Sequence, residues 1–197
     1  MNEGDHMSNI KQSDLYLEEN ASQRPAIELL CKLGYTYLSP EECLRQRGSL
    51  QEVLLKDILR KQLHALNQFT YGGAAYKFTA ENIEKAVKDL DEPLTDGLIR
   101  TSEKIYDALM LGKSYLETLV DGTAKSFNLK YIDWEHPENN VFHVTEEFSC
   151  DSWDRQKNAR PDIVLFVNGI PFAVIECKAP TISEERAVNQ MRRNQEK

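Results

Sequence analysis

The sequence predicts an α/β (α+β) fold in which a helical N-terminal part packs on a mixed β-sheet. Two observations carry this prediction. Apolar residues recur at helical spacing up to residue 119, whereas from Phe127 onward they alternate or form short continuous runs, as is typical of strands. We therefore expect residues 15–125 to be mainly helical and residues 126–197 to form an α/β core, after a disordered or tag-like start at residues 1–14.

The individual elements follow from the same spacing. Helices are expected within residues 15–35, 50–66, 80–90 and 98–119. Gly34 closes the first segment, and Pro25 within it must lie at a helix start or break, so two helices fit there. Strands are expected at residues 127–134, 141–144, 162–167 and 170–178, and a last helix is expected to begin near Ser183.

Composition excludes several classes of protein. The chain has 197 residues with a net charge of −8, and its 41% hydrophobic content is enough to build a core. No apolar run approaches the ~18 residues of a membrane span, and the start lacks the features of a signal peptide. The 4 cysteines form no C-x-x-C pair, which argues against a zinc site or a disulfide scaffold and is typical of a cytoplasmic protein. We therefore expect a cytoplasmic protein without a membrane contact.

Charge is unevenly distributed along the chain. Residues 155–197 hold eight basic and five acidic residues, although the whole chain is acidic. Such a basic end can present a local patch to a polyanion. A solvated surface helix explains the same composition equally well.

Three charged residues interrupt two otherwise apolar predicted strands: Asp162 in the first, and Glu176 and Lys178 in the second. Strands this apolar are expected to be buried on both faces, where a charge is costly unless it is paired or binds an ion. Glu176 and Lys178 are two residues apart and so share one face of their strand. The alternative is an incidental salt bridge at the strand ends.

The loop between the two strands decides whether Asp162 can lie beside Glu176. A two-residue turn at Asn168-Gly169 puts Asp162 opposite Ile175, so that the two carboxylates are on opposite faces. One extra residue, as in a three-residue turn with a bulge at Gly169, pairs the carboxylates directly with Cβ atoms about 5 Å apart. A shared site therefore predicts a bulge or a loop longer than two residues.

Two adjacent carboxylates and a lysine suit the metal-dependent hydrolysis of a phosphodiester. Asp162 and Glu176 can hold a hard cation such as Mg²⁺, with the carbonyl oxygen of Cys177 as an additional candidate ligand. Such a cation polarises the phosphodiester and lowers the pKa of its bound water. Lys178 can orient that water or stabilise the charge that develops on the phosphate.

The order Pro161-Asp162 followed by Glu176-Cys177-Lys178 on a hairpin matches the PD-(D/E)xK nuclease superfamily. The whole segment resembles more closely the N-terminal endonuclease domain of the R subunit of type I restriction enzymes. This resemblance covers most of residues 15–197, and it is also carried by residues 24–35, 131–134 and 139–142. The fold it implies is a PD-(D/E)xK nuclease core.

The resemblance implies roles for individual residues. Asp162, Glu176 and Lys178 match the catalytic triad of that family. A glutamate on the first helix often completes the metal site, and Glu18 is the best match, with Glu19 close behind. For Glu18, a solvated helix face is the alternative explanation.

A second motif of the family, Q-x-x-x-Y, lies on the helix after the catalytic strand. Gln190 matches its glutamine, but Asn194 stands at the tyrosine position. This departure affects the second contact of the motif and not the metal site. Gln190 therefore joins the candidate catalytic residues.

The resemblance also implies a larger assembly. It implies a far longer polypeptide in which an ATP-driven translocase follows this domain, so that the chain is expected to be a fragment that ends before the motor. Double-stranded DNA would be cut with Mg²⁺ after translocation, and ATP would bind only in the motor. Methyltransferase and specificity subunits are the implied partners, and the fragment alone is expected to be weak or inactive.

Two alternatives stay open. The chain can be a PD-(D/E)xK nuclease of another helicase-linked or repair system. It can also be a catalytically degenerate docking module of a DNA-processing complex, which Asn194 favours and the intact set Asp162, Glu176 and Lys178 opposes.

Overall fold

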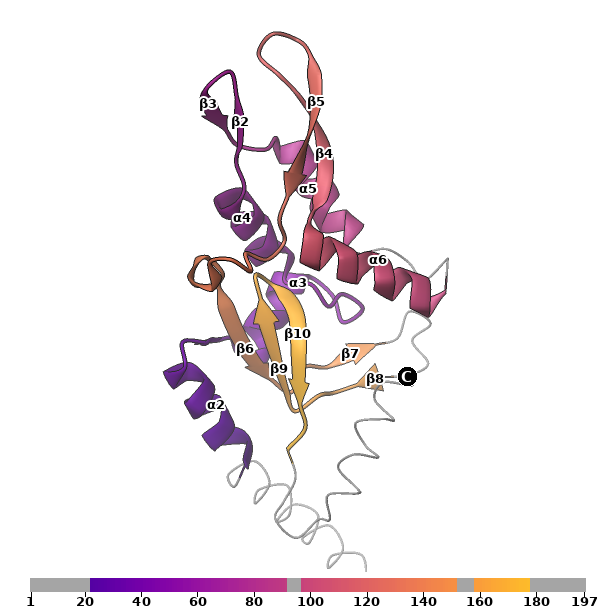
Figure 1. The fold of residues 1–197 in the computed structure, drawn as a ribbon. Helices are drawn as coiled ribbons and strands as arrows, with labels where there is room; N and C mark the ends of the chain where they lie inside the picture. Colours follow the sequence, from indigo (N-terminus) through magenta and orange to yellow (C-terminus); the bar gives the residue numbers. More distant parts are fainter. Residues whose placement is uncertain (1–21, 92–96, 152–157, 178–197) are drawn as a thin grey trace, which may run out of the picture. The chain divides into compact units, whose positions relative to one another are not determined.

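The computed structural model describes residues 22–91, 97–151 and 158–177 (Figure 1). The chain divides into two compact units. The first contains Met1–Val53, Phe142–Phe166 and Pro171–Lys197, and the second contains Leu54–Val141 and Val167–Ile170. The boundary expected between residues 125 and 126 falls within β5 (Ala124–Leu129), which belongs to the second unit.

A four-stranded sheet organises the first unit, in the order β1-β6-β9-β10. β1 (Thr36–Tyr37) runs parallel to β6 (Phe142–Glu146). β9 (Ile163–Val167) and β10 (Ile170–Ile175) are joined by two residues, a connection that only antiparallel neighbours allow. The sheet is therefore mixed, and the predicted α/β class is confirmed.

Helix α2 (Arg24–Lys32) packs on this sheet, as the position of α2 beside β6 in Figure 1 shows. Pro25 lies in its first turn, where a missing N–H costs nothing because that group has no helical acceptor. The apolar face of α2, with Ala26, Ile27 and Leu30, packs against the buried cluster around Val144 and Ile163. The predicted first helix is thus confirmed over its second half.

Besides β1, a helix and a pair of short strands of the first unit were not predicted from the sequence. Helix α3 (Pro40–Arg47) begins after Ser39, whose hydroxyl accepts a hydrogen bond from the backbone N–H of Glu42 at 3.2 Å. This is an ordinary N-cap. The second element is the pair β7 (Cys150–Asp151) and β8 (Asn158–Ala159), which run antiparallel.

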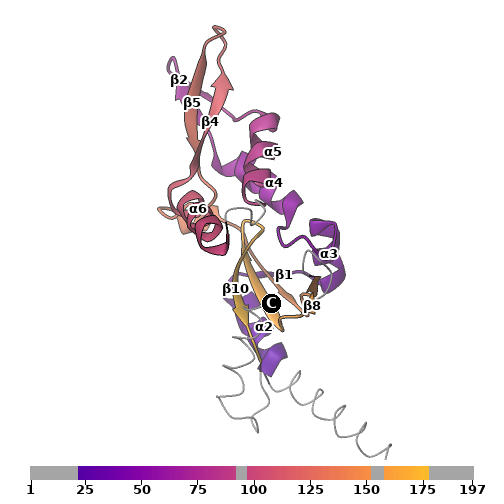
Figure 2. The same ribbon diagram turned by 90° about the vertical axis from the view of Figure 1, so that its right-hand side faces the viewer.

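The second unit combines helices with two hairpins, best followed in Figure 2. Its helices are α4 (Lys56–Leu66), α5 (Ala80–Asp89) and α6 (Leu98–Leu111). One hairpin consists of β2 (Phe69–Tyr71) and β3 (Ala74–Tyr76), and the other of β4 (Lys113–Thr118) and β5 (Ala124–Leu129). The 3₁₀ turn η3 (Pro137–Asn139) follows them in the chain. The helix expected over residues 98–119 is confirmed up to Leu111 and wrong beyond it, because Gly112 at φ 77° ends α6 and a strand begins directly after it. None of the described helices is long and apolar enough to cross a membrane.

The turn between β9 and β10 consists of Asn168 and Gly169, with φ angles of 55° and 84°. Two positive φ angles in a two-residue loop define the tight hairpin turn that Asn-Gly favours. The Asn168 side chain is fully buried; its oxygen accepts from the Val141 N–H, and its nitrogen donates to the Tyr131 carbonyl and to the Asn140 side-chain oxygen. The expectation of a loop longer than two residues is therefore wrong.

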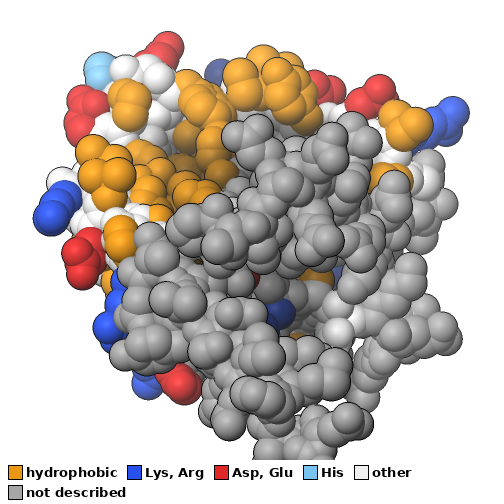
Figure 3. Space-filling view, turned by 90° about the horizontal axis from the view of Figure 1, so that it is seen from below, with side chains coloured by type: hydrophobic (Ala, Val, Ile, Leu, Met, Phe, Trp, Pro, Cys, Tyr) orange, Lys and Arg blue, Asp and Glu red, His pale blue; other side chains and the backbone are white. Residues whose placement is uncertain are grey.

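Strand β10 also differs from the expectation that both strands of this hairpin are buried on both faces. Phe172 is 54% exposed and Val174 is 46% exposed, while β9 is largely buried. Leu29 on α2 and Leu33, directly after α2, are exposed as well. Figure 3 shows apolar side chains gathered over one part of the face seen from below.

We predict that Gly169→Ala lowers the free energy of unfolding by about 2–4 kcal/mol. The alanine would have to adopt an unfavourable left-handed φ, and its methyl group would also clash with neighbouring backbone atoms. The added Cβ would lie 2.7 Å from the Leu55 carbonyl oxygen and 3.0 Å from the Leu59 nitrogen. Gly73→Ala is the matched control, since φ is +83° but no atom lies within 4 Å. Urea unfolding of both variants measures the difference, and equal losses would contradict the prediction.

Candidate functional site

Asp162 lies directly before β9, and its half-buried carboxylate contacts the chain after β10. Its Oδ2 accepts a hydrogen bond of 2.7 Å from the backbone N–H of Cys177. Cys177 is only 5% exposed, and Glu176, one residue earlier, is half-buried. The two predicted halves of the site therefore meet at the open end of the hairpin, although its loop has only two residues.

The remaining predicted site residues lie outside the described part of the chain. They are Lys178, Glu18, Glu19, Gln190 and Asn194, which stands where the family motif has tyrosine. Their proposed roles stay predictions.

The donor atoms present fit a hard cation. Oδ2 of Asp162 accepts the Cys177 hydrogen bond. Carboxylate and carbonyl oxygens are the ligands that Mg²⁺ prefers, with water and phosphate completing its octahedron. Within the described residues, no three His, Cys, Asp or Glu side chains form a metal-binding group. A site here would therefore combine Asp162 and Glu176 with the Cys177 carbonyl and non-protein oxygens.

The backbone of Asp162 is held by the end of β6. Its carbonyl oxygen accepts the N–H of Glu147 at 2.9 Å, and the neighbouring Pro161 carbonyl accepts the N–H of Phe148 at 3.1 Å. Glu147 has φ 52°, a left-handed conformation that is unfavourable for a residue with a long side chain. The side chain of Glu147 forms an ion pair with Arg160, two residues before Asp162.

Three residues that were not predicted from the sequence form a chain of hydrogen bonds to the Asp162 carbonyl: Gln23, Glu146 and Tyr37. The Gln23 side chain is buried, and its Nε2 lies 3.3 Å from Oε2 of Glu146 and 3.4 Å from the carbonyl oxygen of Asp162. The Tyr37 hydroxyl donates to Oε1 of Glu146 at 2.6 Å. Partial burial and the Glu146 carboxylate raise the pKa of Tyr37 to about 12, so it remains a donor at neutral pH. Gln23 and Tyr37 lie beside residues 24–35, one of the segments that carry the family resemblance, and this is their only sequence signal. No sequence signal marks Glu146.

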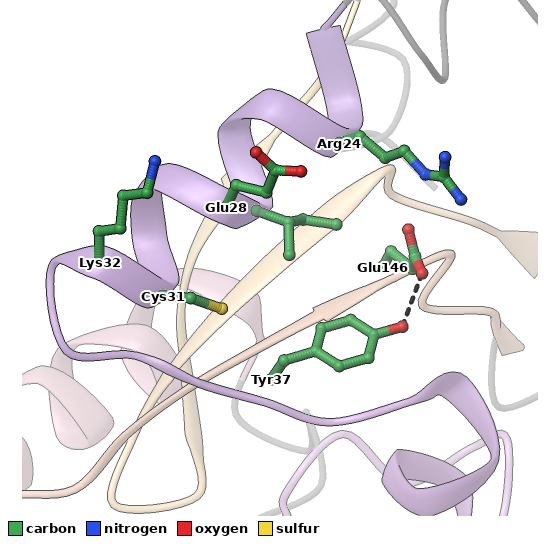
Figure 4. A pocket seen from close by; sticks show the side chains of 7 residues that line it. Arg24, Glu28, Cys31, Lys32, Tyr37 and Glu146 are labelled. Carbon is green, nitrogen blue, oxygen red and sulfur yellow. Dashed lines mark hydrogen bonds between the residues drawn. The ribbon is translucent and has the colours of Figure 1, made fainter.

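A groove of about 640 Å³ opens between helix α2 and the strands β1 and β6 (Figure 4). The Cys31 thiol and the Tyr37 ring face its interior, whereas Lys32 projects away from it. The lining residues are Arg24, Ile27, Glu28, Cys31, Lys32, Tyr37 and Glu146. The groove carries charges of both signs and shares Glu146 and Tyr37 with the contacts around Asp162.

We predict that Asp162→Ala lowers the free energy of unfolding by about 1–3 kcal/mol, because the buried Cys177 N–H loses this acceptor. Asp162→Asn keeps a side-chain oxygen at the same place and should cost clearly less. Chemical denaturation of the three proteins measures the difference. Equal stability of the alanine and asparagine variants would contradict a structural hydrogen bond at this position.

Comparison with known proteins gives a consistent assignment. A family model described as type I restriction enzyme R protein N terminus matches residues 16–197. The MjaIXP endonuclease subunit of Methanocaldococcus jannaschii is 32% identical over 90% of this chain, which spans 16% of that protein. The HindI endonuclease subunit of Haemophilus influenzae is 27% identical over 83% of this chain, which spans 15% of that protein. Since the match covers nearly all of its residues, the chain belongs to the family of type I restriction enzyme R protein N termini.

Proposed function

We propose that this chain is the metal-dependent endonuclease domain of a type I restriction R subunit, and that it hydrolyses phosphodiester bonds of double-stranded DNA. The hydrogen bond from the Cys177 N–H to the Asp162 carboxylate is the observation that supports this most. It brings an acid from the start of one strand to the end of the next, where the P-D…E-x-K pattern has its other charged residues.

Each residue of the pattern has a defined task in this proposal. Asp162 and Glu176 hold a Mg²⁺ ion together with the carbonyl of Cys177. When bound, the cation polarises the phosphodiester and lowers the pKa of a water molecule. Lys178 orients the attacking water or stabilises the negative charge that develops on the phosphate.

Two residues from outside the described ranges complete the proposed site. Glu18 is proposed as a further metal ligand, and Gln190 as a contact to the reacting groups. Neither proposal draws on a contact within the described part of the chain.

The wider setting is part of the same proposal. The relatives are named endonuclease subunits of type I restriction enzymes, and this chain spans only 15–16% of their length. We propose that an ATP-driven motor elsewhere in the subunit translocates DNA in the cytoplasm before cleavage, and that methyltransferase and specificity subunits complete the complex. DNA contacts of this domain would be mainly to phosphates and therefore sensitive to salt.

The test is a calorimetric titration of the chain with Mn²⁺, with the Asp162→Asn variant beside it. The parent should bind the ion and the variant should not, because the amide lacks the charge while keeping an oxygen for the Cys177 hydrogen bond. In the full restriction complex the same variant should lower the DNA cleavage rate at least about a hundredfold.

Glu103→Gln serves as the control, since it removes an exposed carboxylate from α6 in the other unit. It should leave both ion binding and cleavage unchanged. Parental cleavage by the Asp162→Asn complex would overturn the nuclease assignment and favour the docking module.

A further inference from the structure

Both carboxylate oxygens of Glu146 are occupied by neutral donors from separate parts of the chain. Oε1 accepts the Tyr37 hydroxyl of β1 at 2.6 Å, as the dashed line in Figure 4 shows. Oε2 accepts from the Gln23 side chain, which precedes α2, at 3.3 Å. Hydrogen bonds to a charged acceptor are stronger than those between neutral groups. Glu146 therefore acts as a fixed anchor between β1, β6 and the start of α2.

This anchor reaches the peptide of Asp162. The Gln23 nitrogen that contacts Glu146 also lies 3.4 Å from the Asp162 carbonyl oxygen. The same oxygen accepts the N–H of Glu147 at 2.9 Å, the residue directly after the anchor. The Asp162 carbonyl is thus held from two directions, by a side chain at α2 and by the backbone at the end of β6.

The strained conformation of Glu147 indicates that this arrangement is maintained at a cost. Its φ of 52° is unfavourable for glutamate, and such conformations persist only where surrounding contacts over-determine them. Here those contacts are the Glu147–Asp162 hydrogen bond and the ion pair between Glu147 and Arg160. The strain lies one hydrogen bond away from the residue proposed to hold the metal.

We propose that Tyr37, Glu146 and Gln23 are positioning residues that fix the backbone of Asp162, so that its carboxylate is held in the orientation required to bind the cation. This inference rests on the proposed nuclease function. It assigns the three residues no contact with DNA or metal. Their effect is transmitted through the Asp162 carbonyl, in the way that outer hydrogen bonds orient metal ligands in other sites.

The test uses the full-length subunit in its restriction complex and measures DNA cleavage as a function of Mg²⁺ concentration. Tyr37→Phe removes one donor to Glu146 and keeps the ring, and Gln23→Leu removes the link to Asp162. Each variant should raise the Mg²⁺ concentration for half-maximal cleavage about tenfold, the lower end of typical effects of outer hydrogen bonds on metal affinity. At saturating Mg²⁺ the cleavage rate should return to within about threefold of the parent, because the metal ligands themselves are unchanged.

Tyr35→Phe is the matched control. It removes a hydroxyl two residues from Tyr37, on a ring that packs against Phe142, and the described part of the chain offers that hydroxyl no hydrogen bond. Its Mg²⁺ dependence should equal that of the parent. Thermal unfolding of each variant is measured in parallel. An unchanged unfolding temperature shows that a change in Mg²⁺ dependence comes from a displaced Asp162 carboxylate and not from misfolding.

The outcomes are distinct. If Asp162→Asn abolishes cleavage while Tyr37→Phe and Gln23→Leu keep the parental Mg²⁺ dependence, the positioning role is overturned and the nuclease function stands. A loss of rate that excess Mg²⁺ does not restore also overturns it, since a purely structural role gives that result. If Asp162→Asn cleaves normally, the nuclease function itself fails.

Discussion

The structure of the candidate site depends on the turn at Asn168 and Gly169. The turn places β9 and β10 side by side and so determines which residues meet at the open end of the hairpin, where Asp162 contacts Cys177. Its geometry is enforced locally. Gly169 approaches the backbone of Leu55 too closely for any Cβ. The buried Asn168 side chain accepts a hydrogen bond from the Val141 N–H and donates one to the Tyr131 carbonyl. The turn thus sets which residues stand at the two ends of the hairpin strands, Asp162 before β9 and Glu176 after β10.

The prediction of a longer loop failed for a reason that still allows Asp162 to contact the chain after β10. The argument from register assumed that Asp162 and Glu176 both lie within paired strands, where a two-residue turn puts them on opposite faces. In the structure, β9 begins after Asp162 and β10 ends before Glu176. The strict alternation of faces ends with the strands, and the Asp162 side chain is free to reach the Cys177 N–H. A short turn and a shared site are therefore compatible.

The fold was predictable where the information is local. The hairpin and the helices α2, α4 and α5 follow from apolar spacing, which did not need tertiary information. The helix expected through residue 119 failed at Gly112, because an apolar pattern alone does not separate the end of α6 from the start of β4. Gln23, Tyr37 and Glu146 were out of reach for a different reason. Their association joins residues more than one hundred positions apart, and no spacing rule along the chain encodes such a contact.

Two non-glycine residues in the described part of the chain have positive φ angles, Glu147 and Asn168, and both contribute to placing β9. They are not equivalent. Asparagine adopts the left-handed region readily because its short amide can hydrogen-bond nearby backbone, and at Asn168 the turn requires it. Glutamate has no such compensation, so the conformation of Glu147 must be supported by its neighbours. The neighbours that provide this support are Asp162 and Arg160, which places the least favourable backbone conformation beside the proposed metal ligand. Strain at that point is expected if the geometry of Asp162 is selected for chemistry and not for stability.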